Sequence, residues 1–216
     1  NSAGSLLQTL SSQPWDATTM WEMQLTTSGD TTIIVHEDFM MKKLMRTGAT
    51  SFTINDFVFE THSSGYPRYQ PYYKFADEIV TLTPSGTSGS ITLTTSADYW
   101  TSAHNGSVVR YKGKEIDVTG YTSATVLQGT VRETLAATTA DTDWDENVFS
   151  AANGYARSVS FHPRRLWFGG SRDLPNFMFA SKSNAFFNFD VGTGLDDESI
   201  QGNLGQDEVN NIMHLH

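Results

Sequence analysis

The sequence predicts an all-β protein, and three observations support this prediction. Aromatic residues make up 12% of the 216 residues, whereas charged residues make up only 18%. Much of the remainder is Thr, Ser, Asn and Gly, which favour strands and tight turns over helices. Several short segments alternate apolar and polar residues, as half-buried strands do. Hydrophobic residues reach 38%, so there is enough apolar surface to offset the entropy of ordering a core.

The first region, residues 1–74, is expected to contain an antiparallel meander. A β-branched run at Thr31–His36 predicts its first strand. Strands at Lys42–Arg46 and Ser51–Phe59 follow, and a turn at Glu37–Asp38 separates the first two. Asn55–Asp56 is expected to interrupt the third strand with a bulge.

The middle region, residues 75–143, is predicted to be a small β-barrel or β-sandwich domain inserted into the first. Tyr66–Tyr73, with two prolines and four tyrosines, is expected to be the turn-rich hinge that leads into it. Ile91 and Leu93 alternate with threonines. The other strands are expected at Val108–Tyr111, Glu115–Val118, Ala124–Leu127 and Thr130–Leu135.

The third region, residues 144–216, is predicted to complete the outer body. Glycine-rich or aspartate-rich turns separate its short apolar segments. Its strands are expected at Ser158–His162, Arg165–Gly169, Phe177–Ser181 and Val209–Leu215.

The net charge of −10 argues against a surface that grips nucleic acid, because affinity for phosphates depends on Lys and Arg. The absence of cysteine excludes disulfides and thiolate metal sites. No apolar run reaches the roughly 18 residues of a membrane helix, so no membrane span is expected. The two basic pairs, Lys42–Lys43 and Arg164–Arg165, are too small to form a nucleic-acid patch.

No residue is predicted to be catalytic, metal-binding or cofactor-binding, and no cofactor is expected. Asp196–Asp197–Glu198 is the densest acidic cluster, but it lacks the spacing of a calcium loop and is expected to be a solvated turn. His214 and His216 have no third ligand placed by the sequence. Gly192–Gly194 does not precede a helix, so it is not expected to bind phosphate. The sequence also lacks a G-x-S-x-G nucleophile motif.

Aromatic residues crowd the third region, and a packed core between adjacent strands is the expected explanation. A carbohydrate-binding platform is the alternative. The residues concerned are Trp167, Phe168, Phe177, Phe179, Phe186, Phe187 and Phe189.

An ordered series of motifs resembles the tail nozzle proteins of short-tailed bacteriophages (tail tubular protein B) and related packaged-DNA stabilisation proteins. The family pattern has an R-L-x-F-x-G-S strand, a proline turn, a Ser-Arg or Ser-Lys strand end, an F-x-N-F element and a D-D-D/E-x-I segment. The corresponding residues are Arg165–Ser171, Pro175, Ser181–Lys182, Phe187–Phe189 and Asp196–Ile200.

Two upstream stretches, residues 31–59 and 153–162, resemble the same family. They depart from its pattern at Glu37, Met41 and Ala156, where prolines are usual, and at Phe52, where tryptophan is usual. The resemblance covers the two outer regions and leaves the middle one without a family motif.

The resemblance implies a partial propeller-like body with an inserted β domain, assembled as a hexameric ring around a DNA channel in a phage tail. Copies of the chain, adjacent tail proteins and passing DNA would be its partners, and the virion its location. The chain is expected to be non-enzymatic and to be a piece of a longer protein that cannot close its own propeller.

Two alternatives stay open at this stage. The first is a glycan-binding adhesin module that uses Tyr72, Tyr73, Tyr99 or Trp100. The second is a propeller hydrolase, which a pair of carboxylates in an open cleft would reveal.

Overall fold

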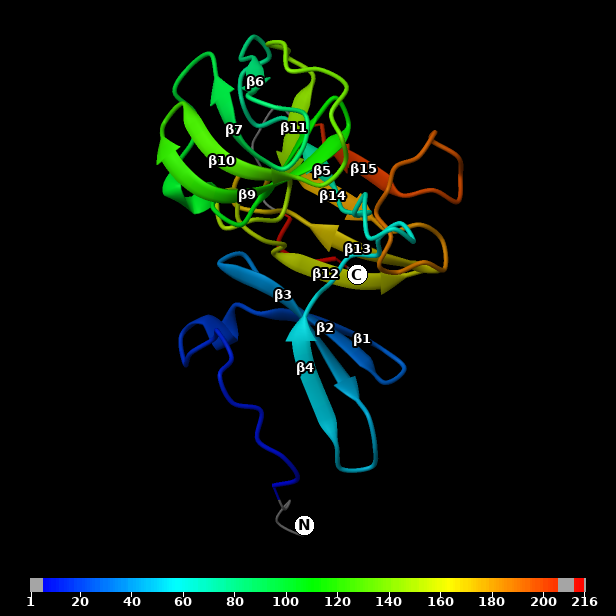
Figure 1. Cartoon of the computed structure of the whole chain (residues 1–216). Coiled ribbons are helices and arrows are strands. Elements are labelled where there is room, and N and C mark those ends of the chain that lie inside the picture. Colours follow the sequence, from blue (N-terminus) through cyan, green and yellow to red (C-terminus); the bar gives the residue numbers. More distant parts are fainter. Residues whose placement is uncertain (1–5, 206–211, 216) are drawn as a thin grey trace. The chain divides into compact units, whose positions relative to one another are not determined.

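A computed structural model describes residues 6–205 and 212–215, and over these residues the chain is all-β, as predicted. The described residues form fifteen strands and two 3₁₀ turns, η1 (Thr19–Trp21) and η2 (Ser102–His104), without an α-helix (Figure 1). None of their helical segments is long and apolar enough to span a membrane.

The chain divides into two compact units. The first contains residues 1–58, 155–187 and 191–216, and the second contains residues 59–154 and 188–190. The middle unit is therefore wider than the predicted 75–143. The predicted boundary at 144 falls inside it because strand β11 (Trp144–Asn147) pairs with β8 (Val108–Tyr111) and β5 (Tyr72–Tyr73) of the middle unit.

The first sheet of the first unit is a four-stranded antiparallel meander of order β1-β2-β3-β4 (Figure 1). Its strands are β1 (Gln24–Ser28), β2 (Thr31–His36), β3 (Phe39–Arg46) and β4 (Phe52–Asp56). Sequence analysis missed β1, which is polar and poorly buried. The expected bulge at Asn55–Asp56 is absent, since these residues pair regularly with Lys43 and Lys42. The register shift lies in the β2–β3 pair instead.

The second sheet of this unit is another four-stranded antiparallel meander, β12-β13-β14-β15. Its strands are β12 (Ser158–His162), β13 (Arg165–Gly169), β14 (Phe177–Ala180) and β15 (Ile200–Asn203). The fourth strand is thus β15 rather than the predicted Val209–Leu215, of which residues 209–211 lie outside the described residues and 212–215 form no strand. Four-stranded sheets of this kind build propeller blades, but the described residues do not close a ring.

The second unit contains a seven-stranded antiparallel sheet of order β5-β11-β8-β9-β10-β7-β6. Its remaining strands are β6 (Leu82–Pro84), β7 (Ser90–Thr95), β9 (Lys114–Ser123) and β10 (Val126–Val131). The two strands expected at Ala124–Leu127 and Thr130–Leu135 are the single strand β10, which pairs with both β9 and β7.

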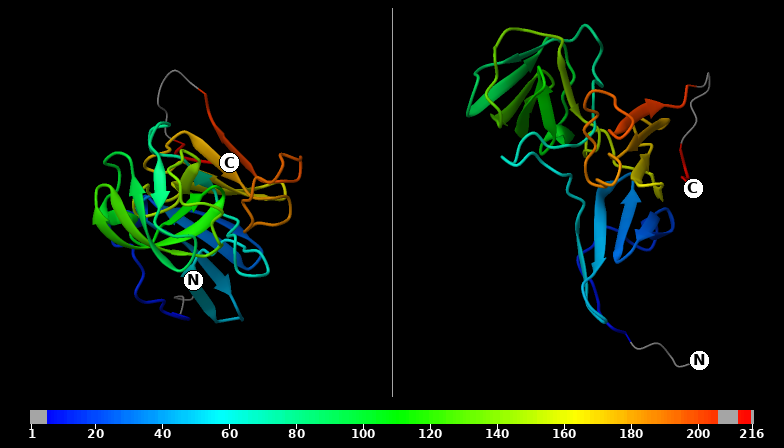
Figure 2. Two further views of the ribbon diagram at one scale, coloured as in Figure 1. Left: turned by 45° about the horizontal axis from the view of Figure 1, so that its top comes forward. Right: turned by 90° about the vertical axis from the view of Figure 1, so that its right-hand side faces the viewer.

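This seven-stranded sheet curls around one hydrophobic core (Figure 2). An isolated antiparallel bridge between Leu82 of β6 and Asp141 joins one edge of the sheet to the segment before β11. In β7, Ile91 and Leu93 point inward while the intervening threonines are exposed, which confirms the alternation seen in the sequence. Trp100 and Tyr111 are among the largest fully buried side chains of this core.

Candidate functional site

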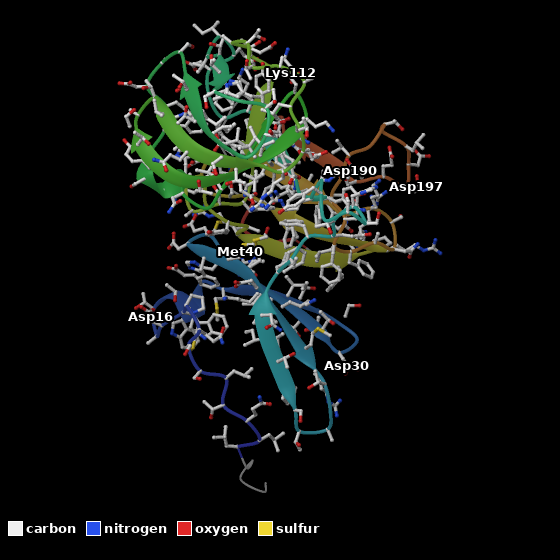
Figure 3. The ribbon with its side chains drawn as sticks, viewed as in Figure 1. Asp16, Asp30, Met40, Lys112, Asp190 and Asp197 are labelled. Carbon is white, nitrogen blue, oxygen red and sulfur yellow. The ribbon has the colours of Figure 1, made fainter. Side chains whose placement is uncertain are left out.

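The acidic cluster Asp196–Asp197–Glu198 lies in the loop before β15. Figure 3 shows Asp197 on this loop. The Glu198 carboxylate bonds to the backbone of the same loop. Its Oε2 atom accepts hydrogen bonds from the backbone N–H groups of Thr193 and Leu195 at 2.6 and 3.0 Å. These bonds satisfy the turn from within, and the described residues contain no group of three potential metal ligands. The cluster is therefore a hydrogen-bonded turn.

Acidification is expected to release this turn. Backbone hydrogen bonds from Leu195 and its neighbours hold the pKa of Glu198 below its ordinary value of 4.5. A lowered pKa stabilises the folded turn above pH 4.5, and that stabilisation is lost as the pH falls through the folded-state pKa. In an NMR titration, the amide protons of Thr193 and Leu195 should shift with a midpoint below 4.5. A midpoint at or above 4.5 would contradict this assignment, and Glu198→Gln should abolish the transition.

Arg165, the first residue of the tail-protein motif, is buried and holds three backbone segments together. Its guanidinium donates to the carbonyl oxygens of Ser181, Glu198 and Asp196, each at 2.5 Å. These acceptors belong to two other motif segments. A buried Arg that is satisfied by carbonyls fixes a loop rather than binding a ligand.

The motif glycine is Gly170, whose φ of +64° favours glycine, and Gly169 occupies the variable position before it. A Cβ atom at Gly169 would lie 2.5 Å from Ser158 Oγ and 2.7 Å from Ile212 Cγ2. Neither atom can move away easily, because both sit close to their own backbone. Both glycines therefore serve the fold.

The two basic pairs are engaged locally or are isolated. Lys42 forms an ion pair with Asp56 at 2.5 Å, and the Lys43 ammonium lies 4.9 Å from the centre of the Phe187 ring. Arg165 is buried, which leaves Arg164 as the exposed member of its pair. Neither pair forms a basic patch.

Three of the seven crowded aromatic residues of the third region are buried in a core. Phe168 and Phe179 are buried partners across β13 and β14, and Phe168 packs edge-on against Phe57. Phe189 is buried in the second unit against Phe59. The other four aromatic residues of the series are partly buried.

The tyrosines and tryptophan named for the adhesin alternative do not form an exposed platform. Tyr72 and Trp100 are buried, while Tyr73 and Tyr99 are partly buried. Tyr99 donates a short hydrogen bond to Glu146, and Trp100 packs against Trp144 at 5.4 Å between ring centres. Tyr99 and Trp100 lie in the irregular segment after β7 and pack into the core of the second unit.

Glu115 of β9 is a carboxylate of the second unit whose side chain is fully buried. The backbone N–H and Nε of Arg68 donate to its two oxygens at 2.6 and 2.8 Å, and the Tyr72 hydroxyl donates to it at 2.7 Å. Burial raises the pKa of Tyr72 well above its ordinary value, and the Glu115 carboxylate acts in the same direction. Tyr72 therefore stays protonated and keeps donating. Sequence reasoning missed this cluster because its members are distant in the chain.

A pocket of about 390 Å³ in the first unit is the best candidate for a ligand site. The Trp21 side chain lines one side of the pocket. Trp21 is the last residue of η1 and is 81% exposed. Around it lie polar side chains from β1, β2 and the segment before β12. The lining residues are Trp21, Glu22, Gln24, His36, Glu37, Arg157, Met213 and His214.

Each polar side chain of this pocket is held by a neighbour. His36 Nδ1 accepts the Asp38 N–H at 3.2 Å, so its Nε2 carries the proton and donates to Glu22 Oε2 at 3.2 Å. Gln24 and His214 are 3.3 Å apart through Oε1 and Nδ1. The pocket is thus preorganised, with an apolar face and several converging polar atoms.

Two carboxylates, Glu22 and Glu37, line the pocket, which is the feature expected of the hydrolase alternative. A glycosidase acid must be kept neutral by an apolar environment. Glu37 instead pairs with Arg157 at 2.6 Å, and Glu22 is 68% exposed and accepts from His36. Neither carboxyl has the surroundings of a catalytic acid, so the arrangement favours binding over hydrolysis. Sequence reasoning placed Glu37 in a turn and did not single out Glu22, and no local pattern joins the two residues.

The comparisons with known proteins add no relative: no family model matches the chain, and no curated protein matches it.

Proposed function

We propose that this chain is a non-catalytic structural subunit of a bacteriophage tail, part of the nozzle ring that retains packaged DNA and lets it pass on ejection. The observation that carries the proposal is the use made of the motif residues. Arg165 and Glu198 bind backbone groups, and Gly170 adopts a positive φ that favours glycine. A mechanical subunit needs residues that stabilise its fold. These three residues do so and do not face a substrate.

A sheet edge also supports assembly. Strand β4 is an outer strand of the first meander and has no further strand partner among the described residues, and only the Gln8 side chain bonds to its backbone, at Phe52. Unpaired edges are sites for pairing with another chain. In a ring, neighbouring copies or adjacent tail proteins would cover them.

The net charge of −10 suits a channel protein past which DNA slides. An acidic wall repels phosphates and lowers friction, since strong binding would need clustered Lys and Arg. The basic pairs of this chain form no such cluster, because Lys42 and Arg165 are already engaged.

The test is assembly together with DNA binding. Light scattering and negative-stain electron microscopy of the purified chain are expected to find a ring-shaped oligomer with a central opening. A mobility-shift titration should find no duplex binding at about 150 mM salt. A monomer at every concentration tested would contradict the assembly role, and micromolar DNA binding with a steep salt dependence would contradict the channel role.

A further inference from the structure

We propose that the pocket beside Trp21 binds a sugar ring of a neutral glycan, an activity separate from the tail assignment and independent of it. Among the described aromatic residues, Trp21 and Tyr121 are the exposed ones, and Trp21, at 81%, is about twice as exposed as Tyr121, at 41%. A flat aromatic face in water can stack against the C–H face of a pyranose.

The tryptophan is held in place rather than left on a loose end. Asp16 Oδ1 accepts the N–H groups of Thr18 and Thr19 at 2.8 and 2.9 Å, and the backbone N–H of Trp21 bonds to the Thr18 carbonyl. Figure 3 shows Asp16 at this turn. The bonds fix the 3₁₀ turn that presents the indole, so binding needs little further ordering.

The polar side of the pocket matches the hydroxyl groups of a sugar. Carboxylates accept hydrogen bonds, amides both donate and accept, and sugar hydroxyls do both. Glu22 and Gln24 supply these groups beside the indole, and their partners His36 and His214 hold them in position. His36 is only 3% exposed, so its contact with Glu22 is a built feature of the pocket.

The charges that line the pocket favour a neutral sugar over a nucleotide, which carries phosphate. The only guanidinium of the pocket, Arg157, is paired with Glu37. Phosphates bind where positive charge is unpaired, so a nucleotide is disfavoured. The described residues also contain no metal cluster that could hold an anion. A neutral polyol satisfies both the indole and the acceptors, and a volume of about 390 Å³ lies within the range of small-molecule pockets.

The experiment uses the whole chain with a panel of neutral oligosaccharides built from glucose, galactose, rhamnose and N-acetylglucosamine. Binding is followed by calorimetry and by tryptophan fluorescence, with AMP and adenosine as competing ligand classes. At least one oligosaccharide is expected to bind and to remain uncleaved. Trp21→Ala should weaken that binding roughly tenfold or more, as loss of an aromatic anchor does. Glu22→Gln should also weaken it.

The matched control is Tyr121→Ala, which removes an exposed aromatic ring from the second unit and should leave the affinity unchanged. Thermal unfolding of Trp21→Ala should match that of the parent chain, because the indole is exposed. The proposal is overturned if no oligosaccharide of the panel binds, if binding survives Trp21→Ala, or if only adenosine or AMP binds. Loss of affinity in Tyr121→Ala would also overturn it, since the site would then lie elsewhere.

Discussion

Replacing Glu115 with Ala is expected to destabilise the second unit by about 3–5 kcal/mol, the usual cost of removing one partner from a buried ion pair. The Glu115 carboxylate is fully buried, and it accepts hydrogen bonds from Arg68 and from Tyr72. Without it, the buried Tyr72 hydroxyl loses its acceptor, and the Arg68 side chain, which is 25% exposed, keeps only Asp117. Leaving such donors unpaired costs more than the bonds themselves contribute.

The surrounding charges increase this effect. Arg68 also bonds to Asp117, and Arg110 stacks 3.7 Å from the centre of the Tyr72 ring while it pairs with Asp145. The network joins the segment that carries Arg68 and Tyr72 to β8, β9 and β11, so its loss should loosen that segment first. Amide hydrogen exchange at β8 and β9, together with urea unfolding, would measure the change.

Glu60→Gln provides the matched control, because Glu60 lies in the same unit and is exposed. Surface charge changes of this kind shift stability by about 0.5 kcal/mol or less. If Glu115→Ala cost no more than Glu60→Gln, the buried network would not be a source of stability.

Replacing Phe168 with Ala is expected to destabilise the first unit by about 3–5 kcal/mol. The ring is fully buried, packs edge-on against Phe57 at 5.3 Å between centres, and lies opposite Phe179 across the β13–β14 pair. The cavity left behind has strand residues on its sides, and regular pairing restricts how far they can relax to fill it. Phe179→Ala should have a similar effect for the same reason.

Amide exchange in β13 and β14 would report this loss, with the second unit's amides as an internal reference. Trp21→Ala is the control, since it also removes a large aromatic side chain of the same unit but from an exposed position. Equal destabilisation by Trp21→Ala and Phe168→Ala would mean that burial does not decide the contribution of these rings.

Local patterns in the sequence were sufficient for the strands with strong periodicity. Thr31–His36, Val108–Tyr111, Ser158–His162 and Arg165–Gly169 were predicted with the bounds that the structure has. These runs are β-branched or aromatic and are flanked by turn residues, so local propensity and tertiary packing agree. Weakly patterned strands were missed: β1 is polar and exposed, and β15 follows a long loop.

The sequence predicted only in part which aromatic side chains point into the core and which point to solvent. Phe168 and Phe179 were assigned to the core because they alternate with other residues along two adjacent strands. Tyr72 and Trp100 were considered as exposed contacts, yet both are buried. Both belong to short or irregular segments, where no period of two or 3.6 residues indicates a face.

The sequence by itself determined the fold class and the meander character of the outer regions, and it placed a turn at Asp196–Asp197–Glu198. Each depends on neighbours within a few residues, where propensity and hydrogen-bonding chemistry act locally. Only the tertiary structure decided the partners of Glu115, which are 43 to 47 residues away, and the pocket that joins Trp21 to Arg157 and His214. Contacts between such distant segments depend on how the strands pair and pack, and no local pattern specifies that geometry.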